Sequence, residues 1–102
     1  MNLEEKYIVN KHATEEILSE NGFRNGVFKC FVYKDIIQLI VRIDLEEQWW
    51  GYQVYNLKTL CTYHPYYDRG YGKHFELEEI DKKINKIMRE LENAKILKKK
   101  YK

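Results

Sequence analysis

The sequence predicts a small α+β domain, in which a three- to four-stranded antiparallel meander is packed by a long C-terminal helix and preceded by a short N-terminal helix. Apolar and polar residues alternate through much of residues 26–63, which is the period of half-buried strands. Apolar residues recur every three or four positions over residues 76–98, which is the period of an amphipathic helix. The chain has 102 residues, 44% hydrophobic and 33% charged. Residues 1–102 therefore form one domain, with residues 99–102 as a basic tail.

The N-terminal part contains one short helix and one ambiguous segment. Residues 13–21 place Ala13, Ile17 and Leu18 on one stripe, and the glycine of Asn21-Gly22 suits a helix end because it accepts the left-handed conformation. Residues 3–9 fit either an additional helical turn or a short edge strand. Both alternatives stay open from the sequence.

The middle of the chain predicts consecutive strands. The expected strands are residues 26–33, 36–44 and 49–55, with a possible fourth at residues 60–63. The turn between the first two falls at Lys34-Asp35. Because the strands follow one another closely, we expect antiparallel pairing between sequential neighbours. The predicted order of elements is therefore α-β-β-β-(β)-α.

The C-terminal helix is expected from Glu76 to about Lys98 and carries an apolar stripe with spacings of 3, 4, 3, 4 and 3 residues. A stripe of this kind usually packs on a sheet, although it can also serve as a dimer seam. The chain is therefore expected to be a monomer or a homodimer through this helix, and Ile96-Leu97 is the segment expected to contact another chain.

The core is predicted from the strand and helix periods together. One face of each strand and the helix stripe should meet, because a helix covering one sheet face is the simplest way to bury both. The predicted core residues are Phe28, Cys30, Val32, Leu39, Val41, Trp50, Tyr52, Val54, Ile80, Ile84, Ile87 and Leu91.

Charge and cysteine content restrict the cellular setting. The net charge of +2 is too balanced to require a nucleic-acid partner, although residues 58–102 carry 12 basic and 7 acidic groups, a net of +5. No apolar run approaches about 18 residues and the first residues do not read as a signal peptide, so we expect no membrane span and a cytoplasmic location. Cys30 and Cys61 are then expected to be reduced thiols.

No catalytic or metal constellation stands out. Cys61 and His64 have C-x-x-H spacing, but structural zinc prefers two tight ligand pairs, and the other ligands available, Cys30 and His74, lie in unrelated segments. No nucleophile elbow or phosphate-binding glycine loop is present. We therefore expect a protein that is not an enzyme and that has no cofactor and no metal.

The first binding hypothesis is that the chain captures another protein. The loop HPYYDRGYGK, residues 64–73, presents Tyr66, Tyr67, Arg69 and Tyr71. Tyrosine and arginine are enriched at interface hot spots because they combine a large contact area with hydrogen bonding. The sequence favours a non-catalytic protein-binding module, acting as a phage or mobile-element accessory factor, with a partner whose identity it does not give.

The alternative hypothesis is that the chain binds single-stranded nucleic acid. The sheet face away from the predicted core carries aromatic, basic and amide side chains, which can stack bases and neutralise phosphates. These are Lys29, Phe31, Tyr33, Gln38, Arg42, Trp49, Gln53 and Tyr55, of which Lys29, Phe31, Tyr33, Arg42 and Tyr55 are the candidate contacts. The lysine-rich tail would assist. Ile36 and Ile40 on the same face instead favour a covered face.

The order of elements resembles that of the double-stranded-RNA-binding domain. The G-P-x-H loop of that family is missing. Of its K-K-x-A-K patch, the three lysines are present as Lys82, Lys83 and Lys86, but Asn85 stands in place of the alanine. These lysines lie well inside the helix rather than at its start. The likeness is one of element order, and no binding mode is taken over from it.

A second resemblance concerns aromatic segments. The runs WGYQVY at residues 50–55, YHPYY at 63–67 and AKIL at 94–97 resemble small uncharacterised proteins of low-GC Gram-positive bacteria and their prophages. The bias toward lysine, isoleucine, tyrosine and asparagine agrees with an A/T-rich genome. The resemblance implies a mobile-element setting and no activity.

Overall fold

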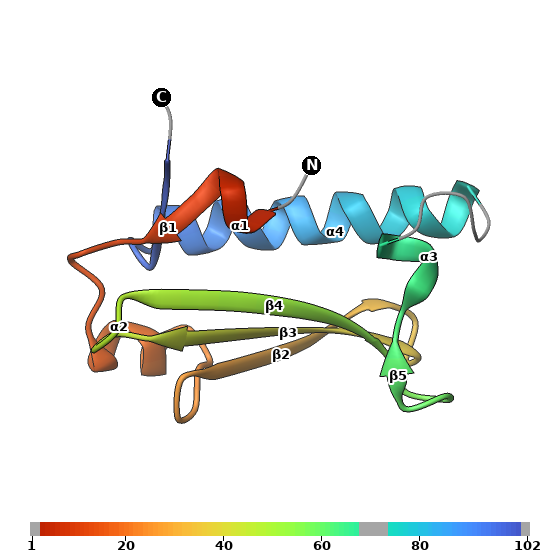
Figure 1. Ribbon diagram of the computed structural model, residues 1–102, viewed down its shortest axis with the longest axis horizontal. Helices are drawn as coiled ribbons and strands as arrows, with labels where there is room; N and C mark the ends of the chain where they lie inside the picture. Colours follow the sequence, from red (N-terminus) through yellow and green to blue (C-terminus); the bar gives the residue numbers. More distant parts are fainter. Residues whose placement is uncertain (1–2, 68–73, 101–102) are drawn as a thin grey trace.

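The computed structural model describes residues 3–67 and 74–100 and confirms the predicted α+β class (Figure 1). Its elements are α1 (Leu3–Lys6), β1 (Tyr7–Val9), α2 (Glu15–Glu20), β2 (Val27–Tyr33), β3 (Ile37–Asp44), β4 (Trp49–Asn56), β5 (Cys61–Thr62), α3 (His64–Tyr67), α4 (His74–Asn93) and β6 (Leu97–Lys99). The sequence left open whether residues 3–9 form a helical turn or a short strand. The segment contains both, because α1 runs directly into β1.

The central sheet is an antiparallel meander in the order β2-β3-β4-β5, as predicted. Its register is regular through the middle. Val41 lies between Phe28 and Tyr52, and Leu39 lies between Cys30 and Val54. Strand β2 has a partner on one side only, so it forms a free edge of the four-stranded sheet.

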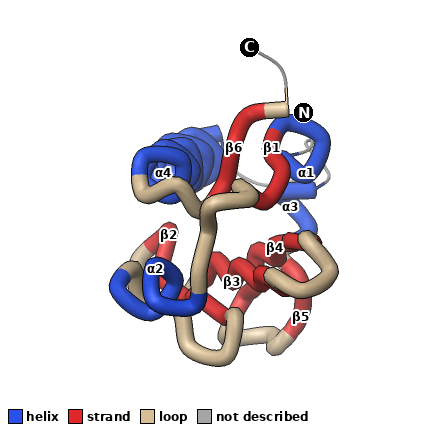
Figure 2. Tube along the Cα trace, turned by 90° about the vertical axis from the view of Figure 1, so that its left-hand side faces the viewer, coloured by secondary structure: helices blue, strands red, loops and turns tan. Residues whose placement is uncertain are grey.

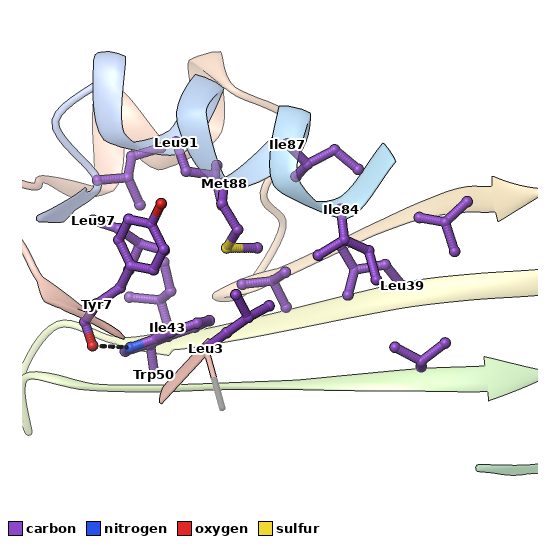
Figure 3. Close-up of a cluster of buried hydrophobic side chains, with 14 of the residues drawn as sticks. Leu3, Tyr7, Leu39, Ile43, Trp50, Ile84, Ile87, Met88, Leu91 and Leu97 are labelled. Carbon is purple, nitrogen blue, oxygen red and sulfur yellow. Dashed lines mark hydrogen bonds between the residues drawn. The ribbon is translucent and has the colours of Figure 1, made fainter. Parts of the chain in front are cut away.

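One face of this sheet, called the inner face here, is covered by the rest of the fold. Figure 2 shows α4 and the β1–β6 ribbon on the same side of the sheet, with α4 above β2 and β1 above β4. The indole N–H of Trp50 in β4 donates to the carbonyl of Tyr7 at 2.9 Å, which joins the two layers across a buried contact (Figure 3). Because the indole N–H is buried, this bond spares it the cost of an unsatisfied donor.

The predicted core lies on the inner face. Nine of its twelve members are buried, and the other three, Phe28, Cys30 and Tyr52, are half-buried and pack against them. The completely buried positions include Leu39, Val41 and Val54 on the sheet. The period-2 pattern therefore placed the inner and outer sides of β3 and β4 correctly.

The amphipathic stripe of α4 completes this core. The buried residues of the helix are Leu77, Ile80, Ile84, Ile87, Met88 and Leu91. The stripe is occupied by contacts within the chain, because all six residues belong to the same buried cluster as the inner-face residues of the sheet (Figure 3). In the described part of the chain no helix is both long enough and apolar enough to cross a bilayer.

The end of the chain differs from the prediction. Helix α4 ends at Asn93 instead of Lys98, and the chain turns back so that β6 pairs antiparallel with β1. Ile96 and Leu97 are fully buried, so the prediction that they face another chain is wrong. The predicted tail also begins too early, because Lys99 belongs to β6.

Candidate functional site

The opposite side of the sheet, called the outer face here, is open in the described part of the chain. Helix α2 lies beside one end of the sheet and leaves the middle of this face uncovered (Figures 1 and 2). Of the residues predicted for the outer face, Lys29, Phe31, Arg42, Trp49 and Gln53 are exposed, and Gln38 and Tyr55 are half-buried; Asp44, opposite Trp49, is exposed on the same face. Of the two isoleucines expected to signal a covered face, Ile40 is buried although its neighbours Lys29, Arg42 and Gln53 are exposed, and Ile36 is half-buried against the core.

Two aromatic side chains lie in one row across the outer face. Phe31 pairs with Gln38, and Gln38 pairs with Tyr55, so the two aromatic residues are two strands apart, about 10 Å at ordinary strand spacing. Phe31 is 43% exposed, so its ring can be reached from solvent. The Tyr55 hydroxyl donates to the carbonyl of Leu60 at 2.6 Å, which fixes its ring beside the row.

Two cations lie on the same face as these rings. Lys29 occupies the adjacent row, and Arg42 lies one row further along β3, where it also lines the hollow at the far end of the face. The Arg42 guanidinium donates to the Gln53 amide oxygen at 3.2 Å, a cross-strand bond that holds the arginine over the sheet. An arginine held by one amide retains further N–H donors that can bind phosphate. The face thus combines stacking surfaces with phosphate-binding groups.

The far end of the outer face has a different character. Trp49 is 54% exposed, and its ring lies so close over Gly51 that a Cβ at that position would approach it to 2.8 Å. Beside it is a hollow of about 500 Å³ whose lining includes three carboxylates, on Glu15, Asp44 and Glu46. These carboxylates make this end less favourable for a polyanion than the Phe31 end.

One predicted contact residue lies on the wrong side. The pairing shifts between Phe31 and Tyr33, so that Tyr33 pairs with Ile37, a buried residue of the inner face. Tyr33 packs against the core, and the alternation that assigned it to the outer face fails at this bulge. Tyr33 is therefore removed from the nucleic-acid candidates.

The tyrosine loop proposed for protein capture is used structurally where it is described. Tyr66 is only 8% exposed, and its ring stands edge-on against Tyr52 and Tyr67. The Tyr67 hydroxyl accepts the backbone N–H of Val54 at 2.8 Å, so this side chain extends the hydrogen bonding of β4 beyond the short β5. Tyr66 therefore offers little surface to a partner. The other two candidates, Arg69 and Tyr71, lie outside the described residues.

The two thiols lie in different surroundings. Cys30 faces the core, where burial raises its pKa against a smaller lowering by Lys83, so the thiolate is disfavoured. Cys61 is exposed. Within residues 3–67 and 74–100, no three histidine, cysteine or acidic side chains gather as a metal site would require.

Three lysines of α4 lie next to Phe31. The alternation of apolar and polar residues in the strands could not predict this, because the lysines belong to the helix. Lys82, Lys83 and Lys86 line a groove between α4 and the edge strand β2. Their spacing of one and four residues, away from the apolar stripe, is the sequence signal for a shared helix flank. Their distance from the sheet depends on how α4 is rotated over β2, which the sequence does not specify.

Comparison of the chain with protein families, with curated proteins and with solved structures finds no match. The function is therefore argued from the geometry of the outer face.

Proposed function

We propose that the chain is a non-catalytic module that binds single-stranded nucleic acid on the outer face of its sheet. The observation that carries the proposal is the exposure of Phe31 on an uncovered face, in one row with Tyr55 and next to Lys29. Aromatic rings stack on any base, because every base has a π-face, and nearby cations neutralise the backbone. Such an arrangement binds without strong sequence preference.

The open face favours this function over capture of a protein by the tyrosine loop. Of the two described members of that loop, Tyr66 is buried, and Tyr67, although 48% exposed, is held by its bond to Val54. On the outer face, Phe31 and Lys29 are both exposed and lie in adjacent rows, so that a ring and a charge are accessible together. Protein capture through the outer face is the outcome that the salt experiment below would identify.

The direct test measures binding of a fluorescent oligothymidylate of about 8 nucleotides by anisotropy, a length within the range covered by one small binding domain. The variant Phe31→Ala should weaken binding roughly 5- to 150-fold, because one stacked base contributes about 1–3 kcal/mol. Phe31→Leu is the matched control, since leucine keeps apolar bulk but has no π-face. It should be nearly as defective as alanine.

A salt titration completes the test. Binding that depends on phosphate should weaken steeply between about 50 and 200 mM salt, with log affinity linear in log salt concentration. The proposal is rejected if no oligonucleotide binds at low salt, or if Phe31→Leu binds like the unaltered chain. A partner protein whose binding is insensitive to salt and depends on Phe31 would assign the face to protein capture.

A further inference from the structure

A groove of about 460 Å³ runs between the free edge of β2 and the flank of α4. One wall consists of Phe31, Val32, Tyr33 and Lys34, and the other of Glu79, Lys82, Lys83 and Lys86. The two elements that carry these walls lie at the same side of the molecule, with α4 above β2 (Figure 2). No described element covers this groove on its solvent side, since all of its charged residues are exposed.

The charge of the groove suits an anion. Four lysines and one glutamate line it, which leaves three positive charges in excess. The Lys34 ammonium lies 5.3 Å from the centre of the Tyr33 ring, so a cation is held at the mouth of the groove by a cation–π contact. On the other wall, Lys82 and Lys86 are one helical turn apart, which places their charged groups in a row along the axis of α4.

The groove is continuous with the outer face through a single residue. Phe31 pairs with Gln38 in the outer-face row, and the same residue, on the edge strand, also lines the groove. A ligand whose base stacks on Phe31 therefore meets the lysines of α4 once it passes over the edge of β2. The other end of the outer face is bordered by carboxylates, so the charge pattern directs a polyanion toward this edge.

We infer that the groove between β2 and α4 holds the phosphodiester backbone of the same strand whose bases stack on the outer face. This inference rests on the proposed function. The strand crosses the sheet from Tyr55 to Phe31, turns over the edge of β2 and continues between Lys34 and the lysines of α4. Longer strands then bind more tightly than the short ones that fill only the outer face.

The test compares two oligothymidylates, one of about 8 and one of about 16 nucleotides, which are lengths within the range for a small binding domain. The double variant Lys83→Gln/Lys86→Gln should lose the additional affinity of the longer strand, about tenfold, while its affinity for the shorter strand stays within twofold of the unaltered chain. Its salt slope on the longer strand should be shallower by about 1.4, at about 0.7 for each lost phosphate contact.

The matched control is Lys11→Gln/Lys58→Gln, which removes the same charge at two exposed lysines in turns away from the groove. It should leave both affinities within twofold. The inference is overturned if the two double variants behave alike, or if the longer strand binds no more tightly than the shorter one. If Phe31→Ala still lowers the affinity for the shorter strand in that case, the proposed function is retained. Absence of binding to both strands overturns the two together.

Discussion

Lys95, two residues beyond the end of α4, turns the chain back in a conformation that glycine adopts more readily. Its φ of 62° lies in the left-handed region, and the next amide, of Ile96, donates back to the carbonyl of Leu91 at 2.9 Å. Helices commonly end in this way with glycine at the left-handed position, because a Cβ there is costly. The chain adopts this strained backbone conformation at Lys95 because the turn places Ile96 in the core.

Replacing Lys95 with glycine should therefore stabilise the protein by about 0.5–1 kcal/mol. The control Lys95→Ala removes the same charge but keeps a Cβ, so it should bring no such gain. Urea unfolding of the three proteins measures the difference. Equal unfolding free energies for the glycine and alanine variants would show that the left-handed backbone is not strained.

Because of Tyr63, the unfolding free energy is expected to vary with pH in the alkaline range. Its side chain is buried, and its hydroxyl donates to the Glu76 carboxylate. Burial, followed by this bond, raises the pKa of Tyr63 far above its ordinary value near 10. The pKa values of Tyr7 and Tyr67 are raised as well, chiefly by burial.

A pKa raised on folding gives stability that is complete below the unfolded value and is lost as pH rises above it, because the unfolded tyrosine ionises first. The unfolding free energy should therefore be level up to about pH 9.5 and fall beyond it. Tyr63→Phe should make that fall less steep, as measured by urea unfolding at a series of alkaline pH values. A fall of the same steepness in both proteins would contradict this assignment.

At the scale of elements, the β1–β6 ribbon closes the core on the side of β4. Tyr7 and Val9 in β1 and Leu97 in β6 are buried, and the Lys100 amide donates to the Lys6 carbonyl to continue the ribbon. The ribbon joins residues about ninety positions apart. It therefore anchors the two ends of the described chain on the sheet.

This arrangement predicts that Leu97→Ala costs about 2–5 kcal/mol of unfolding free energy, the usual range for a leucine fully buried in a core. The control is Leu60→Ala. Leu60 is 70% exposed, so its truncation should change stability by no more than about 0.5 kcal/mol. Chemical unfolding of both variants checks the contrast. Similar values would mean that residues 94–99 do not pack as described.

The elements also show which parts of the fold the sequence can predict. Alternation identified the buried sides of β3 and β4, because both strands are regular across their full register with each other. The strand β6 was missed because its partner β1 is distant in sequence and the apolar spacing of Ile96 and Leu97 also fits a helix. The bulge in β2 was missed for a related reason: where a strand gains a residue depends on its partner, and this reversed the side assigned to Tyr33.

The same distinction holds for the candidate site. Lys29, Phe31, Arg42 and Tyr55 could be assigned to the outer face from the period of two alone. The burial of Tyr66 could not be predicted, because it depends on the tertiary contact with Tyr52 across the end of the sheet. The groove lysines required a further fact, the rotation of α4 about its axis above β2.

At the scale of the whole molecule, the fold is a two-layer arrangement with one open side. The upper layer of α4, α1 and the β1–β6 ribbon covers the inner face, and the outer face remains accessible through its middle (Figure 2). Helix α4 carries four basic and six acidic residues, but three of its lysines, Lys82, Lys83 and Lys86, gather at the groove beside the edge of β2. Stacking surface and positive charge therefore meet at that edge.

The most direct test of this two-sided account is an NMR titration of the ¹⁵N-labelled protein with an oligothymidylate of about 16 nucleotides, which is long enough for both surfaces. The account predicts that amide shifts change around Lys29, Phe31 and Tyr55 and along the α4 flank at Lys83 and Lys86. The amide chemical shift of Val9, in the β1–β6 ribbon, should not change. Changes confined to that ribbon, or no change at all, would contradict it.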